Sequence, residues 1–165
     1  MSISPKISTC LWFDGQAEEA ARFYTGIFKN SSIGAICHYP AVGQEIHGNP
    51  PGKVMTVEFT LDGSKFTGLN GGPHFKFSEA ISFEIHCETQ EEIDYFWEKL
   101  REGGDPESQQ CGWLKDKFGV SWQVVPAGWE EYYKDHTNPA TQRAFAAMLE
   151  MKKLDIAALK AAYDG

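Results

Sequence analysis

The sequence predicts an α+β fold made of two β-α-β-β-β repeats and a C-terminal helical tail. Two segments share a pattern in which a pair of glutamates is followed, at the same offset, by a pair of aromatic residues. The two copies are Glu18, Glu19, Phe23 and Tyr24, and Glu91, Glu92, Phe96 and Trp97. Each copy has helical periodicity and lies between runs with period-two alternation. We therefore expect one domain, with repeats over residues 7–70 and 80–126 and a tail over 127–165.

The composition is typical of an acidic globular chain. Of the 165 residues, 42% are hydrophobic, which is enough for one core. The net charge of −8 argues against a nucleic-acid groove or an anionic membrane surface as partner, because both need clustered Lys and Arg. No apolar run could span a bilayer and the first residues lack the form of a signal peptide, so we expect a cytoplasmic protein. The four cysteines form no C-x-x-C pair, which predicts reduced and mostly buried thiols.

The first repeat should contain one helix and four strands. Asp14 is the expected start of the helix. Its apolar stripe comprises Ala17, Ala20, Ala21, Tyr24, Ile27 and Phe28. The expected strands span residues 7–13, 32–38, 54–61 and 65–69. Residues 40–52, rich in Gly, Pro and Asn, should form a loop, and Asp62-Gly63 a tight turn.

The second repeat follows the same order. Thr89 and Glu92 have the form of a capping box, and Gly103-Gly104 should end the helix that they begin. The apolar stripe of this helix comprises Ile93, Phe96, Trp97 and Leu100. The expected strands span residues 81–87, 107–110, 112–117 and 121–125.

After Pro126 the pattern becomes helical. Asn138-Pro139 is a favourable cap and first-turn pair, and a last helix should follow Asp155. The apolar side chains of the two helices are Phe145, Met148, Leu149, Ile156, Leu159 and Tyr163. They must be buried against the chain's own sheet or against a partner subunit, and we expect a homodimer.

Four stretches resemble the PhnB-like family of the vicinal oxygen chelate (glyoxalase/bleomycin-resistance/dioxygenase) superfamily. They are FDGQAEEAARFYTGIF, LNGGPHFKFSEAISFEIHCETQEEIDYFWEKL, QCGWLKDKFGVSWQVVP and AMLEMKKLDIAALKAAY. Members of this family are often labelled 3-demethylubiquinone-9 3-methyltransferase. The resemblance implies the superfamily fold, in which two curved sheets enclose a ligand cavity. It says less about chemistry, because one fold hosts many activities.

Active members of the superfamily bind a divalent metal through His, Gln or Glu on the first and last strands of each repeat. Aligned on that pattern, the corresponding positions hold Thr9 and Thr67 in the first repeat, and Ala80 and Gln123 in the second. Divalent ions need charged oxygen or imidazole ligands to offset dehydration. We therefore expect no metal at the usual site, and no other cofactor is indicated.

Glu84 and His86 are the clearest candidates for chemistry. They alternate with Ile81, Phe83 and Ile85, so they should point away from the helix and, in this fold, toward the cavity. A carboxylate and an imidazole at this spacing could act as an acid/base pair on one bound molecule. They could also lie in water at the edge of the sheet.

Glu58 and Trp113 are further candidates for ligand contact. Glu58 lies on a predicted central strand among apolar residues, where a carboxylate needs a hydrogen-bond partner or water. It could instead face solvent on a half-exposed sheet. Trp113 could flank a ligand if Gln123 faces the cavity, in which case Trp122 belongs to the core.

Three functions are compatible with these residues. The first is a protein or enzyme that binds an unidentified small molecule without the usual metal, through Thr9, Glu58, Thr67, Glu84, His86, Trp113 and Gln123. The second is a metal-dependent lyase or dioxygenase that uses other ligands. The third is the methyltransferase of the family label, although the glycine-rich turn and acidic ribose contact of the common S-adenosylmethionine fold are missing.

Overall fold

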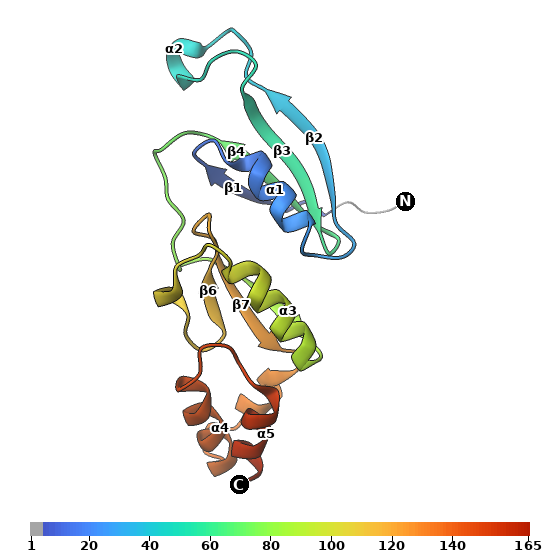
Figure 1. Cartoon of the computed structure of the whole chain (residues 1–165), viewed down its shortest axis with the longest axis vertical. Helices are drawn as coiled ribbons and strands as arrows, with labels where there is room; N and C mark the ends of the chain where they lie inside the picture. The colour runs from blue at the N-terminus through green and yellow to red at the C-terminus, as the bar shows by residue number, and fades with distance from the viewer. Residues whose placement is uncertain (1–4) are drawn as a thin grey trace. The chain divides into compact units, whose positions relative to one another are not determined.

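The computed structural model describes residues 5–165, which form two compact units divided between Lys76 and Phe77 (Figure 1). Unit 1 contains the first predicted repeat. Unit 2 contains the second repeat together with the helical tail. Among residues 5–165, none of the helices combines the length and apolarity that crossing a bilayer requires.

Unit 1 contains a four-stranded sheet with the order β1-β4-β3-β2. Its strands are β1 (Thr9–Phe13), β2 (Ser32–His38), β3 (Val54–Leu61) and β4 (Ser64–Asn70). β1 and β4 run parallel, and the other neighbours are antiparallel. Asp62 and Gly63 both have positive φ in the turn between β3 and β4, as the Asp-Gly pair predicted.

The helix α1 (Ala17–Thr25) covers one face of this sheet, and its predicted stripe from Ala17 to Tyr24 is buried (Figure 1). The predicted start at Asp14 is wrong. Gln16 occupies the N-cap position without a side-chain bond, and the Ala17 amide donates to Asn70 Oδ1 at 2.9 Å. The cap thus comes from β4, so no local residue is needed to satisfy this amide.

The loop between β2 and β3 contains a short helix, α2 (Gln44–His47), which the sequence did not predict. Gly43 and Gly48 flank it with φ of 83° and 69°, which other residues adopt only with strain. The ring of Tyr39 stacks on His47 at 4.6 Å. The loop is therefore locally ordered, although it is rich in Gly and Pro.

Unit 2 contains a three-stranded sheet with the order β5-β7-β6. Its strands are β5 (Ser82–Cys87), β6 (Trp113–Lys115) and β7 (Ser121–Pro126). The helix α3 (Gln90–Arg101) packs on one face and buries Ile93, Trp97 and Leu100. The predicted cap is confirmed, because Thr89 Oγ1 accepts from the Glu92 amide at 3.2 Å.

The strand predicted over residues 107–110 is wrong. The 3₁₀ helix η1 (Pro106–Ser108) occupies most of that segment, and only Gln110 forms an isolated bridge, to Trp113. Pro106 has no amide to donate to a sheet, and the Asp105 carboxylate accepts from the Glu107 amide at 2.9 Å. These two local effects favour a turn over an extended strand.

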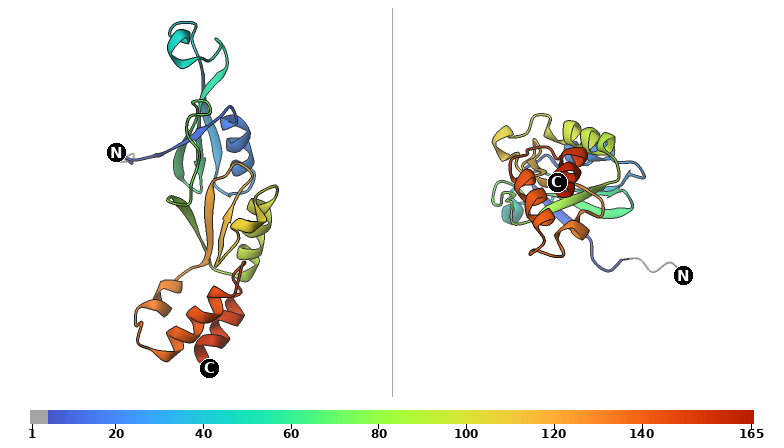
Figure 2. Two further views of the ribbon diagram at one scale, coloured as in Figure 1. Left: turned by 90° about the vertical axis from the view of Figure 1, so that its left-hand side faces the viewer. Right: turned by 90° about the horizontal axis from the view of Figure 1, so that it is seen from below.

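The tail comprises η2 (Trp129–Tyr133), α4 (Pro139–Leu149) and α5 (Ile156–Asp164), with α4 and α5 side by side (Figure 2). The predicted caps Asn138 and Asp155 are confirmed by bonds to the amides of Ala140 and Ala158. The tail has its own buried core of Trp129, Ala144, Leu154 and Leu159. These four residues are buried within unit 2, whereas Phe145 and Leu149, which were expected to be buried, are 45% and 47% exposed.

The Gln90 side chain connects the tail to α3. Its amide group donates to the Leu154 carbonyl at 3.1 Å and accepts from the Ile156 amide at 2.8 Å. Lys153 pairs with Asp94 at 2.7 Å, and the hydrogen bond from Lys153 lowers the pKa of the Asp94 carboxyl. These bonds hold the segment between α4 and α5 against the start of α3.

Replacing Asn70 should destabilise the protein more than replacing an ordinary helix cap. Asn70 is 2% exposed, caps α1 and donates to the Val54 carbonyl at 3.0 Å. Asn70→Ala should lower the free energy of unfolding by about 2–4 kcal/mol, and the control Asn138→Ala by about 1 kcal/mol. Urea denaturation followed by circular dichroism measures both. Equal losses would mean that Asn70 acts only as a cap.

Candidate functional site

Each sheet has one face covered by its own helix and an opposite face, here called the helix-free face. In unit 1, Leu11, Phe13, Val57 and Phe59 point toward α1 and are buried. Because side chains alternate along a strand, their neighbours in sequence belong to the helix-free face. The same alternation in unit 2 puts Ile85 and Val124 under α3. The predicted site residues can therefore be assigned to faces.

In unit 1, Glu58, Thr67 and Cys10 form a row across the helix-free face. Glu58 pairs with Thr67 in the β3–β4 register, and Thr67 pairs with Cys10 in the β4–β1 register. The structure therefore brings two predicted residues together. Thr9 lies instead on the helix-covered face, with Leu11 and Phe13. Cys10 occupies the position on the helix-free face that was predicted for Thr9.

In unit 2, Glu84, Gln123 and Trp113 form the corresponding row. Glu84 pairs with Gln123 in the β5–β7 register, and Trp113 pairs with Gln123 in the β6–β7 register. The Gln123 side-chain amide donates to Ser82 Oγ at 2.9 Å, which orients it along the same face. Trp113 is half-buried. The row thus combines a carboxylate, an amide and an indole.

Glu84 and His86 lie on this face as a pair. His86 Nε2 is 3.5 Å from Glu84 Oε2, and the two side chains are 53% and 54% exposed respectively. A contact this exposed contributes only about 0–1 kcal/mol to stability, and it is an ion pair only when His86 carries a second ring proton. Neither side chain is sequestered, so both remain accessible to a bound molecule. A carboxylate and an imidazole this close can contact the same ligand.

Ser121 is a candidate that the sequence reasoning missed. It lies two residues before Gln123, so the alternation of β7 puts it on the helix-free face, where it pairs in register with Ser82 and Lys115. Ser121 is 1% exposed, and its hydroxyl has no hydrogen-bond partner among the described residues. The alternation from Gln123 was the signal that could have identified it.

Two other sequence features have structural explanations. Trp122 belongs to the core, as expected if Gln123 faces away from α3, and its indole donates to the buried Asp116 carboxylate at 2.8 Å. Gly71 follows β4, where an added Cβ would overlap the Trp12 ring. The Gly71-Gly72 pair therefore allows the chain to pass close to Trp12, whose indole donates to the Gly72 carbonyl.

The strand register corrects the positions aligned for a metal. The parallel pairs are Cys10 with Thr67 and Glu84 with Gln123, so Cys10 and Glu84 replace Thr9 and Ala80. A carboxylate thus occupies one of the positions in unit 2. Among residues 5–165, however, no three His, Cys, Asp or Glu side chains are grouped to hold a metal ion. Such sparse donors do not fit a divalent ion, which needs several charged or imidazole ligands.

Comparison with known proteins extends over most of the chain. The family model described as 3-demethylubiquinone-9 3-methyltransferase matches residues 5–125. Among solved structures, a PhnB protein from Bacillus cereus with the same description is 40% identical, with a TM-score of 0.63. The match covers 74% of this chain and all of that one. No curated protein matches the sequence.

Two more distant structures share the fold. A Pseudomonas aeruginosa protein is 20% identical, with a TM-score of 0.58 and coverage of 75% of this chain and 98% of its own. The fosfomycin resistance protein FosX from Listeria monocytogenes is 17% identical, with a TM-score of 0.51 and coverage of 81% and 99%. At these identities the likeness concerns the fold alone.

The faces assigned to the cysteines can be checked by labelling. Cys37 and Cys10 are exposed and Cys111 is half-buried, so the expectation of mostly buried thiols is wrong. Burial raises the pKa of the Cys87 thiol to about 12 and raises the pKa of the Cys10 thiol above its ordinary value. At pH 8, Ellman's reagent should react with Cys37 first, with Cys10 more slowly, and with Cys87 only after unfolding, because the thiolate is the reactive form. Peptide mass spectrometry identifies the sites. Rapid native labelling of Cys87 would contradict its place under α3.

Proposed function

Because this chain belongs to the PhnB-like 3-demethylubiquinone-9 3-methyltransferase family of the vicinal oxygen chelate superfamily, we propose that it binds a small polar organic molecule without a divalent metal. The proposal places the contacts on the helix-free faces. Its main support is the row of Glu84, Gln123 and Trp113 in unit 2, with His86 beside it.

These side chains suit a ligand with a polar group and a flat part. Glu84 accepts hydrogen bonds, the Gln123 side chain both donates and accepts, and His86 does either according to its tautomer. Trp113 offers an apolar surface in the same row, against which a planar group can pack. Binding sites of this kind combine an apolar wall with a few placed polar groups.

The row in unit 1 offers a second set of contacts. Glu58, Thr67 and Cys10 supply a carboxylate, a hydroxyl and a thiol in adjacent strands. Glu58 and Cys10 are exposed, and Thr67 is half-buried. Within residues 5–165, none of these side chains is held in an ion pair that binding would first have to break. We propose that this row makes polar contacts of its own on the helix-free face of unit 1.

Glu84 and His86 also support an acid/base role, in which one side chain takes a proton from the ligand and the other stabilises the charge that forms. The reaction class follows from the ligand, which is not identified by these residues. Methyl transfer, named in the family description, is a second candidate. It would require S-adenosylmethionine to bind. Both sheets contain a parallel pair, but among the described residues the segments that join β1 to α1 and β5 to α3 are Asp14-Gly15-Gln16 and Glu88-Thr89, and neither is the glycine-rich turn of the common methyltransferase site.

A metal-dependent reaction is the third candidate, and Glu84 favours it. Glu84 is a carboxylate at the register position of unit 2 that was expected to hold alanine. Gln123 is its partner across the strands, and His86 lies 3.5 Å away. The experiment described next therefore also tests whether the chain binds a metal.

A thermal-shift screen of the intact chain separates the three candidates. Polar metabolites, S-adenosylmethionine, and manganese, nickel or zinc chloride are added separately, because a ligand that binds only the native state raises the melting temperature. We expect a polar metabolite to raise Tm without added metal. A shift with a metal alone, and metal retained after dialysis, would overturn the metal-free proposal. A shift with S-adenosylmethionine alone would favour methyl transfer.

Variants then test where the ligand binds. Glu84→Gln and Gln123→Leu should each weaken binding of the screened metabolite about tenfold or more, since a hydrogen bond to a charged or amide group is worth about 1–3 kcal/mol. The control is Glu91→Gln, an exposed carboxylate on α3, which should bind normally. Calorimetric titration measures all three. Normal binding by both row variants would exclude this face.

We also propose that the chain forms a homodimer. Val42 and Ile46, in the loop between β2 and β3, are 80% and 86% exposed, and apolar side chains this exposed often mark an interface. Size-exclusion chromatography with light scattering should give twice the chain mass of 18.5 kDa at micromolar concentration. The double variant Val42→Ser with Ile46→Ser should shift the mass toward one chain. A monomeric parent would refute the dimer.

A further inference from the structure

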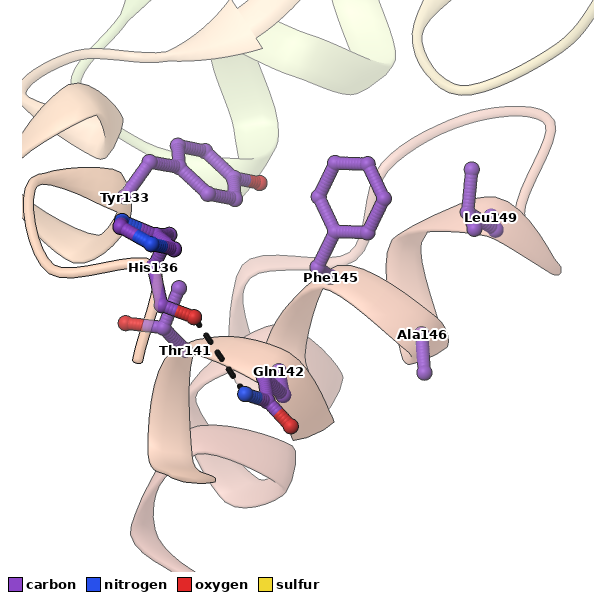
Figure 3. A pocket seen from close by; sticks show the side chains of 7 residues that line it. All are labelled: Tyr133, His136, Thr141, Gln142, Phe145, Ala146 and Leu149. Atoms are coloured by element: carbon purple, nitrogen blue, oxygen red, sulfur yellow. Dashed lines mark hydrogen bonds between the residues drawn. The ribbon is translucent and has the colours of Figure 1, made fainter. Parts of the chain in front are cut away.

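The tail contains an apolar cleft that none of the proposed ligand contacts uses. Its volume is about 470 Å³, and η2 and α4 supply its walls (Figure 3). It lies beyond residues 5–125, the part of the chain that matches the family model. None of its lining residues belongs to the rows proposed to contact a ligand on the sheets.

Apolar side chains from η2 and α4 form the walls of the cleft. Phe145 and Leu149 are four residues apart on α4, so they project from the same side of the helix. Tyr133, from η2, meets Phe145 edge to face with 6.0 Å between ring centroids. Figure 3 shows the two rings and Leu149 around one space. The wall is thus largely aromatic and aliphatic.

The hydroxyl of Tyr133 is already engaged beneath this wall. It accepts a hydrogen bond from the Trp129 indole and donates to the sulfur of Met148 at 3.1 Å. Burial raises the pKa of Tyr133 to about 12, so the side chain is neutral at physiological pH. Tyr133 therefore presents the edge and face of its ring to the cleft, and its polar atom is directed into the tail core.

Polar groups are confined to one part of the cleft. His136 and Gln142 line it together with Thr141, and the Gln142 amide donates to the His136 carbonyl at 3.3 Å. This bond orients Gln142 and leaves its side-chain oxygen as an acceptor. The hydroxyl of Thr141 donates to the Tyr132 carbonyl. A ligand would thus meet the polar groups of His136 and Gln142 at one end and an apolar wall elsewhere.

The size of the cleft indicates that its occupant is a small molecule and not a protein. Phe145 and Leu149 are the large apolar side chains of this cleft that are left exposed, at 45% and 47%. A stable protein interface needs about 800 Å² from each partner, whereas small-molecule sites have volumes of about 300–1,000 Å³. Two half-exposed side chains fall far short of the first requirement, and the volume of the cleft meets the second.

We propose that the cleft of Tyr133, His136, Gln142, Phe145 and Leu149 binds a small planar aromatic molecule with one polar substituent. The ring system packs between Phe145 and Tyr133, where offset and edge-to-face contacts add to the burial of apolar area. The substituent lies toward His136 and Gln142. Binding covers the apolar surface that Phe145 and Leu149 expose in the free chain.

The test uses the intact chain and 1-anilinonaphthalene-8-sulfonate, an aromatic probe that has a planar naphthalene ring system and a single sulfonate. Its fluorescence should rise with a saturable one-to-one curve, and indole should displace it. Phe145→Ser and Leu149→Ser should each weaken binding about tenfold, because each removes most of one apolar wall. The control Tyr95→Ser removes another exposed aromatic residue from a helix of unit 2 and should bind as the parent does.

Two further measurements distinguish a lost cleft from unfolding and from dissociation of a dimer. Circular dichroism and Tm must show that Phe145→Ser remains folded, and Leu149→Ser supplies an independent reading if it does not. Light scattering must give the same mass for the parent and for both cleft variants. Undiminished probe binding in both variants would overturn the proposal. So would a dimer that dissociates in either variant, because a second copy would then occupy the cleft.

Discussion

The structure depends on the burial of one apolar helix stripe against one face of a sheet, which happens once in each unit. α1 buries Ala17, Ala20, Ala21 and Tyr24, and α3 buries Ile93, Trp97 and Leu100. Because strand side chains alternate, this burial also decides which residues can lie on the opposite face. Cys10, Thr67 and Glu58 in unit 1, and Glu84, Gln123 and Trp113 in unit 2, occupy that face in matching registers. The core and the candidate site are therefore two consequences of one constraint.

The two repeats share this geometry but differ in chemistry. The row in unit 1 contains a thiol and a hydroxyl where the row in unit 2 contains a carboxylate and an amide, and only unit 2 adds an imidazole. This difference means that each row offers a ligand a different set of polar groups. It also explains why membership of the family establishes the scaffold more firmly than a reaction, since the reactive groups lie at positions that the fold leaves free to vary.

The tail is stabilised in a different way from the repeats. Its core of Trp129, Ala144, Leu154 and Leu159 is its own, and bonds from Gln90 and Asp94 fasten it to the start of α3. The family model matches residues 5–125, so the tail lies outside that match. Burial in the tail is incomplete at Phe145 and Leu149. That exposed apolar surface is the basis for assigning the tail a binding role beyond the stabilisation of unit 2.

The sequence by itself determined the repeated order of elements, the helix stripes and the caps at Thr89, Asn138 and Asp155, because periodicity and capping depend on residues within a few positions of one another. It also named Thr67, Glu58, Glu84, Gln123 and Trp113 as candidates for ligand contact, and the strand register then placed them in two rows. It failed where the deciding partner was distant or where local bonds competed. The cap of α1 comes from Asn70, which is 53 residues away from Ala17, and the turn at Pro106 displaced an expected strand. The strand register likewise placed Cys10, and not Thr9, on the helix-free face, since a one-residue shift reverses the face of a side chain. Only the tertiary structure could decide these points, because each depends on contacts between segments whose pairing local sequence does not specify.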